Sequence, residues 1–272
     1  MKKLMYFALI LVLVAGVTLF GAWSPVTQVE TTETRYADAP MVSKIASTSI
    51  YFTSREIVEE HNTDGGAPLY YMNEGLDNAC GPLAGAAIAA FYDKYYPELI
   101  PGWDSYYPSN GKYRLQGSTY TSALLQEMYT LMQTNVNGAG VSESEFKTGL
   151  QTYFTNHGYS ASFQNVKSGS TLNYSACKAA IDSNKVIVLF TTPGDIYDVA
   201  KGSDHDTIIS YNIAGNHIMY AYGYLQLKYY NSTGLFRTDT YLLVSTGRSI
   251  TTIAYYKVDS SNLEAAYVVN VN

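Results

Sequence analysis

The order of the hydrophobic patterns along the chain is the feature that most constrains its fold. Between residues 80 and 184 apolar side chains mostly recur at helical spacing, and from Thr207 onward they follow the short runs and alternation of strands. Helices that precede a series of strands are typical of α+β proteins, in which helices cover one side of an antiparallel sheet. We therefore expect an α+β fold with a helical half packed on an antiparallel β-sheet.

The same patterns predict the individual elements. Helices are expected at residues 57–60, 80–95, 122–134, 143–156 and 174–184. Strands are expected at residues 49–53, 159–166, 186–191, 208–211, 217–227, 240–244, 251–258 and 267–271. Capping-box spacing precedes two of the helices, at Thr53 with Glu56 and at Ser142 with Glu145.

The N-terminal part divides the chain into three regions. Residues 1–22 have the layout of a secretory signal, because Lys2 and Lys3 precede an apolar run from Leu4 to Phe20. That run is at the short edge of a membrane span, so an uncleaved N-terminal anchor is the alternative. Residues 23–66 are expected to be a linker that masks the site as a propeptide, or an extension packed on the core. Residues 67–272 are expected to form the functional domain of a secreted or cell-surface protein.

Composition and charge exclude two classes of protein. Hydrophobic residues make up 47% of the 272 residues and charged residues only 15%, which argues against general disorder. The formal net charge is −6 with no basic block, so no nucleic-acid partner is expected.

His205 lies between Asp204 and Asp206, but no second His or Cys stands at ligand spacing, so no metal is expected. No cofactor is expected either.

Cys80 and His217 are the candidate catalytic residues. Cys80 is expected in the first turn of an apolar helix, where the helix dipole and free N–H groups lower the pKa of a thiol. His217 opens the strand 217–227, and alternation puts it on one face with Met219 and Ala221, which we expect to lie against the alanine-rich helix of Cys80. A thiol at a helix start and an imidazole at a strand start suit a nucleophile and its base.

Structural interpretations of these residues remain open. Cys80 could form a disulfide with Cys177 in an exported protein, or it could be an inert core cysteine. His217 could be a structural histidine whose ring is satisfied by its neighbours.

The sequence around both residues resembles a known family. Asn-Ala-Cys80-Gly-Pro-Leu-Ala-Gly-Ala, followed by Gly-Asn-His217-Ile-Met-Tyr-Ala-Tyr-Gly-Tyr, resembles papain-like cysteine peptidases, above all their bacteriocin-processing-like and streptopain-like bacterial branches. The resemblance covers about residues 68–272. It implies a papain-like fold and a secreted peptidase that takes a peptide or protein substrate. Cys80 would attack the peptide carbonyl as a thiolate, and His217 would hold the proton and return it to the leaving amine.

The resemblance also assigns supporting roles. The family commonly has Gln or Asn before the cysteine as an oxyanion donor. Here Glu74 stands six residues before Cys80, and Asn73 and Asn78 are the available amides.

The family's third residue, Asn or Asp, follows the histidine strand, and Ser245 occupies that place here. A serine can accept the imidazole N–H, although more weakly than a carboxylate does. Asp239 and Asp206 are the alternatives for this role.

Two other functional classes are compatible with the same residues. One is another Cys/His acyl-transfer enzyme, such as a cell-wall peptide amidase or a transglutaminase-like protein. The other is a catalytically inactive papain-like binding or surface protein, for which Glu74 and Ser245 are the arguments.

Overall fold

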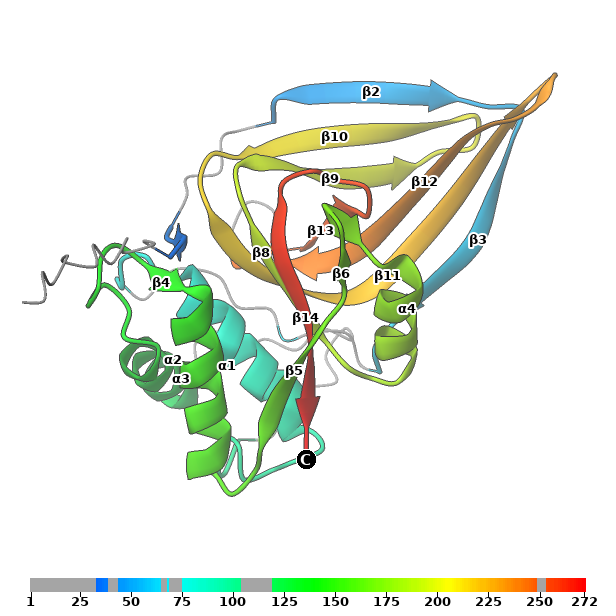
Figure 1. The fold of residues 1–272 in the computed structure, drawn as a ribbon. Coiled ribbons are helices and arrows are strands. Elements are labelled where there is room, and N and C mark those ends of the chain that lie inside the picture. The colour runs from blue at the N-terminus through cyan, green and yellow to red at the C-terminus, as the bar shows by residue number, and fades with distance from the viewer. Residues whose placement is uncertain (1–32, 39–43, 65–67, 69–74, 104–118, 249–252) are drawn as a thin grey trace, which may run out of the picture. The chain divides into compact units, whose positions relative to one another are not determined.

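The computed structural model describes residues 33–38, 44–64, 68, 75–103, 119–248 and 253–272 (Figure 1). These residues belong to one compact unit, Glu33–Asn272. The signal or anchor expected at residues 1–22 lies outside the described residues. No helix in the described part of the chain is long and apolar enough to cross a membrane.

The chain forms an α+β fold, as the sequence predicts. Its helices are α1 (Cys80–Asp93), α2 (Thr119–Leu131), α3 (Glu143–Asn156) and α4 (Tyr174–Asp182). Its strands are β1 (Arg35–Tyr36), β2 (Ala46–Tyr51), β3 (Ser54–Asn62), β4 (Val141–Ser142), β5 (Ala161–Asn165), β6 (Lys167–Ser168), β7 (Thr171–Leu172), β8 (Ile187–Thr191), β9 (Gly194–Lys201), β10 (His205–Ile213), β11 (His217–Asn231), β12 (Gly234–Ser245), β13 (Ile253–Lys257) and β14 (Leu263–Val271).

An antiparallel sheet of ten strands organises the fold. Its order is β2-β10-β9-β13-β12-β11-β8-β14-β5, and β3 also pairs with β11. The long strand β11 makes this branching possible. One of its edges pairs with β12, while the other pairs first with β8, from His217 to Ala221, and then with β3, from Gly223 to Tyr230.

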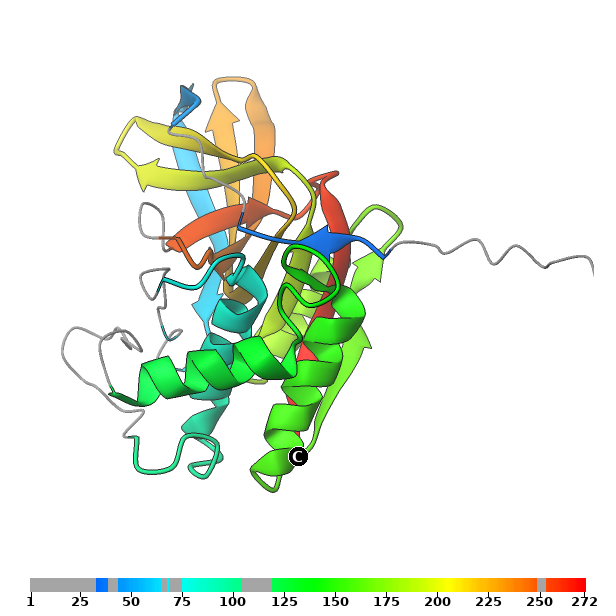
Figure 2. The same ribbon diagram turned by 90° about the vertical axis from the view of Figure 1, so that its left-hand side faces the viewer.

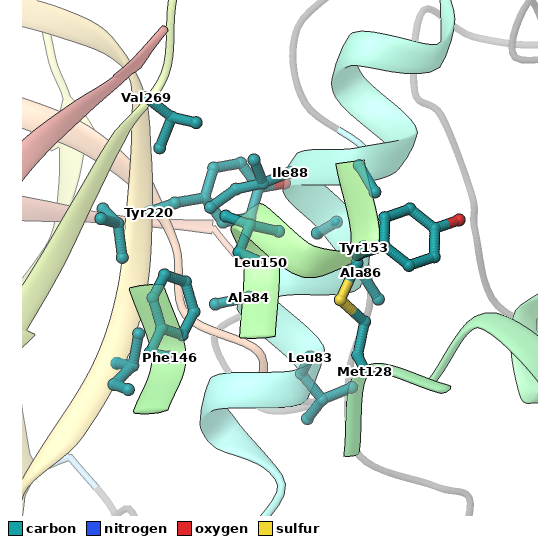
Figure 3. Close-up of a cluster of buried hydrophobic side chains, with 14 of the residues drawn as sticks. Leu83, Ala84, Ala86, Ile88, Met128, Phe146, Leu150, Tyr153, Tyr220 and Val269 are labelled. Carbon is teal, nitrogen blue, oxygen red and sulfur yellow. The ribbon is translucent and has the colours of Figure 1, made fainter. Parts of the chain in front are cut away.

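Helices cover both faces of the sheet where β8, β11 and β14 lie together. Figure 1 shows α1, α2 and α3 on one side of these strands and α4 on the other. All of α1 is buried, because its alanine and glycine residues let α2, α3 and β11 approach closely. Figure 3 shows the resulting core, in which Leu83 and Ile88 of α1 lie among Met128, Leu150 and Tyr220.

The prediction of a helix at residues 57–60 is wrong. These residues belong to β3, which pairs with β11 from Ser54 to Asn62. The spacing of Thr53 and Glu56 is only a local signal, and backbone pairing along a whole strand outweighs it. Strand β9 was not expected from the sequence.

The described part of the region expected to be a linker or packed extension contains the strands β1, β2 and β3. β2 pairs with β10 and β3 with β11, so these parts of residues 23–66 are packed on the core. The compact unit therefore begins before the expected boundary at residue 67. β1 pairs with β4, and Figure 2 shows β1, in blue, beside the loop that leads into α3. Removal of the region by proteolysis stays a prediction.

Candidate functional site

Cys80 is the first residue of α1, as the sequence predicts, and its side chain is closed off from solvent. The residue is 2% exposed. It borders a cavity of about 10 Å³, which is room for about one water molecule. The cavity is lined by Cys80, Leu83, Ala84, Ala87, Ile218, Tyr220, Ser245 and Gly247.

Burial dominates the electrostatics of this thiol. It raises the pKa of Cys80 to about 12, and the nearby Asp38 carboxylate adds to the rise. The backbone N–H groups of Ile218 and Gly81 and the Arg248 guanidinium lower the pKa, but by less. The expected low thiol pKa is therefore not found while the site is covered, because the helix N-terminus cannot offset the lost hydration.

His217 is buried as well, and one hydrogen bond fixes its ring. Its Nε2 lies 2.7 Å from the carbonyl oxygen of Thr246, so Nε2 carries the proton and donates it. Nδ1 is then the unprotonated nitrogen, and among the described residues it has no hydrogen-bond partner. Burial, followed by the charge of Arg248, lowers the pKa of His217 to about 3, so the imidazole is neutral.

Strand β11 presents the opposite face to α1 from the one expected. Ile218 and Tyr220 pack in the core that contains α1, whereas Met219 and Ala221 pack in the core that contains α4. The thin α1 leaves room for the large side chains of this face, so small partners are not needed there. The prediction that His217, Met219 and Ala221 share the α1 side is wrong.

The Cys80 side chain nevertheless lies close to the backbone at the start of β11. The N–H of Ile218, the residue after His217, acts on the Cys80 thiol, and the Arg248 guanidinium influences the pKa of both Cys80 and His217. Cys80 Sγ and His217 form no hydrogen bond in the described part of the chain. The thiol instead donates to the carbonyl oxygen of Ala37, at 3.4 Å.

Ser245 lines the same cavity as Cys80, but within the described part of the chain its hydroxyl forms no hydrogen bond with the imidazole of His217. Thr246, the next residue, supplies the oxygen that orients the His217 ring, through its backbone carbonyl. Asp239 and Asp206 are also engaged elsewhere: Asp239 pairs with Arg237 at 2.7 Å, and Asp206 pairs with Arg55. A backbone carbonyl has no residue-type signal, so the sequence could not reveal it.

Asn78 is occupied by other contacts, and Asn73 and Glu74 lie outside the described residues. The Asn78 side chain donates to Asn135 Oδ1 at 3.0 Å and accepts the N–H of Asp38 at 3.4 Å. The Asp38 carboxylate faces the N-terminus of α1, where N–H groups of Ala79, Asn78 and Cys80 lower its pKa against a larger rise caused by burial. The N–H groups that an oxyanion would use therefore face a carboxylate of the same chain.

Residues 33–38, which we call the covering segment, lie within the region 23–66 that was expected to mask the site, but the sequence interpretation named none of them as site residues. Tyr36 is fully buried, with its ring 5.2 Å from that of Phe190. Arg35 forms an ion pair with Glu145 at 2.9 Å. The isolated tyrosine within a polar stretch was the available signal, and it has no periodicity to mark it as core.

The disulfide alternative for Cys80 is wrong. Both Cys80 and Cys177 are free, and they lie in different cores. Within the described residues, no group of three or more His, Cys, Asp or Glu side chains could hold a metal ion.

No family model, curated protein or solved structure matches this chain. The interpretation of the site therefore depends on its own geometry.

Proposed function

We propose that the chain is a secreted cysteine peptidase with a papain-like arrangement, in which Cys80 is the nucleophile and His217 is the general base and acid. The orientation of His217 is the observation that supports this most. Its Nε2–H is held by the Thr246 carbonyl, which leaves a buried Nδ1 lone pair that has no partner in the described part of the chain. His217 also directly precedes Ile218, whose N–H acts on the Cys80 thiol. An imidazole oriented by a third group is one part of the arrangement that activates thiols, and the approach of His217 Nδ1 to Cys80 Sγ is part of the proposal.

The proposed reaction starts from a neutral pair. With the thiol pKa at about 12 and the imidazole pKa at about 3, neither group is charged in the covered state. As Cys80 Sγ attacks a peptide carbonyl, its proton moves to His217 Nδ1, and the Thr246 carbonyl stabilises the imidazolium through Nε2–H. Attack requires Sγ and Nδ1 to come within hydrogen-bond reach, and access of solvent lowers the thiol pKa toward its usual range.

The N-terminus of α1 is the proposed oxyanion site. Its N–H groups point toward the Asp38 carboxylate in the covered state, and the same groups can stabilise the negative oxygen of a tetrahedral intermediate once Asp38 leaves. The side-chain amide of Asn78 is oriented by its donation to Asn135 Oδ1 and by the Asp38 N–H that its oxygen accepts.

A specific observation also favours the inactive binding protein as a second candidate. Cys80 and His217 share no hydrogen bond, and the thiol donates to Ala37 instead. A protein that kept the fold without catalysis would hold its thiol in this way permanently.

Hydrolysis of casein by the full chain and two cysteine variants separates these candidates. We expect Cys80→Ala to abolish hydrolysis and Cys177→Ala to retain it, because Cys177 is buried in the other core. The rate of iodoacetamide modification of Cys80, located by mass spectrometry, should fall in a His217→Ala variant. Hydrolysis that persists in Cys80→Ala would refute the proposal. Absence of hydrolysis together with an iodoacetamide rate like that of free cysteine would favour the binding protein.

A further inference from the structure

The peptide group between Ala37 and Asp38 shows how a peptide lies against the proposed nucleophile. Its carbonyl oxygen accepts the Cys80 thiol proton, with Sγ at 3.4 Å. Its N–H donates to the side-chain oxygen of Asn78, also at 3.4 Å. A substrate whose reacting carbonyl takes this place, with its chain in the same direction, brings its next residue to the position of Asp38.

Backbone contacts fix the direction of the chain at this point. Arg35 and Tyr36 pair antiparallel with Ser142 and Val141. The side-chain amide of Asn216 donates to the carbonyl of Arg35 at 2.9 Å. Because these contacts engage the backbone of the covering segment rather than its side chains, a different extended peptide can make them in the same direction.

The Asp38 carboxylate lies in surroundings that favour an anion. The Arg248 guanidinium is 3.9 Å from Asp38 Oδ1, and the two side chains are only 13% and 14% exposed. Backbone N–H groups of residues 78–80, at the start of α1, also act on this carboxyl and lower its pKa against the larger rise caused by burial. We call Arg248 and these N–H groups the carboxylate site. A cation and several N–H groups that converge on one point stabilise a negative side chain more than a neutral one.

Arg248 belongs to the turn that also orients the proposed base. Its N–H donates to Thr246 Oγ1 at 3.1 Å, and the carbonyl of Thr246 accepts the Nε2–H of His217. Gly247, between them, has a φ of 67°, which favours glycine, and it lines the cavity beside Cys80. The turn therefore keeps the start of the Arg248 side chain at a fixed place relative to both His217 and Cys80.

The carboxylate site leaves one N–H group for the reaction itself. Among the N–H groups that act on Asp38, that of Ala79 lowers its pKa most and that of Cys80 least. The N–H of Cys80 belongs to the residue that carries the nucleophile, and we assign it to the oxyanion. A substrate carboxylate held mainly by Arg248 and Ala79 is then compatible with attack by the thiol.

We infer that Arg248 is a specificity-determining residue and that this chain prefers substrates with Asp or Glu directly after the cleaved bond. This inference rests on the proposed peptidase function and names its substrate class. A neutral side chain in the carboxylate site forgoes the attraction of the guanidinium, and a lysine brings a second positive charge next to it. The expected order of preference at this position is therefore acidic, then neutral, then basic.

Cleavage of casein by the full native chain tests this preference. Mass spectrometry of the fragments identifies the residue after each cut, and we expect Asp and Glu there more often than their share of the casein sequence. One cleaved sequence is then made as three quenched fluorescent peptides that carry Asp, Asn or Lys directly after the cut. We expect kcat/KM for the Asp peptide to exceed that for the Asn peptide by about tenfold, and the Lys peptide to be the poorest substrate.

Variants of Arg248 show whether this residue sets the preference. Arg248→Gln should bring the ratio of kcat/KM between the Asp and Asn peptides close to one. Arg248→Lys should keep part of the ratio, because lysine retains the charge, and Arg248→Glu should make the Lys peptide the best of the three. Each ratio is taken within one variant, so an effect of Arg248 on the pKa of Cys80 or His217 cancels.

Asp38→Asn is the matched second variant, because it removes the chain's own carboxylate and leaves Arg248 in place. KM for the Asp peptide should fall in this variant, since the peptide no longer competes with Asp38, while the ratio between the Asp and Asn peptides remains. This variant also keeps the inference testable if the Arg248 variants fail to fold. A KM for the Asp peptide that does not fall would contradict the carboxylate site.

These measurements separate the inference from the function on which it rests. If the native chain cleaves the Asp and Asn peptides equally well, or if Arg248→Gln keeps the native ratio, the specificity inference is wrong and the peptidase proposal stands. If the native chain does not cleave casein, both are wrong.

Discussion

Asp93 carries a buried carboxyl group at the last residue of α1. It is 2% exposed and accepts the backbone N–H of Ile100 at 2.7 Å. Burial raises the pKa of this carboxyl to about 7, and Glu98 adds to the rise, while the hydrogen bond from Ile100 opposes it. A carboxylate at a helix C-terminus is also disfavoured by the dipole. The neutral, protonated form of Asp93 is therefore the one that the fold favours.

We expect an Asp93→Asn variant to have a free energy of unfolding that depends less on pH. The folded chain binds the Asp93 proton more tightly than the unfolded chain does, so this group stabilises the fold below pH 4. That stability is lost as the pH rises to about 7. The loss should be about 3 kcal/mol in the native chain and absent in the variant, which keeps the acceptor for Ile100.

Urea unfolding between pH 4 and pH 8 measures this difference. Glu98→Gln is the matched control, because it removes only the smaller electrostatic contribution, and its curve should stay close to the native one. Parallel curves for Asp93→Asn and the native chain would contradict the assignment.

At the scale of elements, two glycines let the helices pack closely around Met132, which follows α2. A Cβ added at Gly149 of α3 would lie 2.8 Å from the backbone nitrogen and Cα of Met132. A Cβ added at Gly85 of α1 would lie 2.5 Å from the terminal Cε of the same residue. The first obstacle is backbone, whereas the second is the end of a flexible side chain.

Gly149→Ala should therefore destabilise the protein more than Gly85→Ala. Alanine gains about 1 kcal/mol of helix propensity over glycine at either position. At Gly149 the displacement of the Met132 backbone outweighs that gain, and we expect a net loss of about 1–3 kcal/mol. At Gly85 the Met132 side chain can turn away, so the net change should be close to zero. Thermal unfolding of both variants gives the comparison, and equal midpoints would refute it.

An element can be predicted from the sequence when its own residues carry the pattern of a helix or a strand. The helix at residues 143–156 was predicted with its capping box, and Ser142 and Glu145 form that box in the structure. Its signal lies within a single turn. Residues 57–60 of β3 are predicted as a helix, because most residues of β3 are exposed and the strand that they pair with begins far away, at His217.

At the scale of the whole molecule, the strands β2 and β3 are parts of the sheet. The Arg55 side chain of β3 forms an ion pair with Asp206 of β10, whose side chain is buried. Tyr229 of β11 donates a hydrogen bond to the same carboxylate at 3.0 Å. This group of residues joins three strands. Loss of the Arg55 guanidinium would leave the buried Asp206 carboxylate without its compensating charge.

We expect a chain of residues 67–272 to be much less stable than a chain of residues 33–272. The shorter chain lacks β1, β2 and β3, so one edge of β11 loses its pairing partner from Gly223 to Tyr230 and Asp206 loses Arg55. The longer chain keeps the whole compact unit. Circular dichroism and thermal unfolding compare the two. A cooperative transition of residues 67–272 at the same midpoint would show that the expected domain boundary is correct.

The sequence by itself determined the α+β class, the helix that begins at Cys80 and the strand that begins at His217. Each of these has a signal in its own residues: hydrophobic period, helix-start residues or turn residues. Only the tertiary structure decided what surrounds them. The Thr246 carbonyl orients His217, and the covering segment closes the site over Cys80. Backbone groups and segments distant in the sequence make these contacts, so no residue pattern encodes them locally.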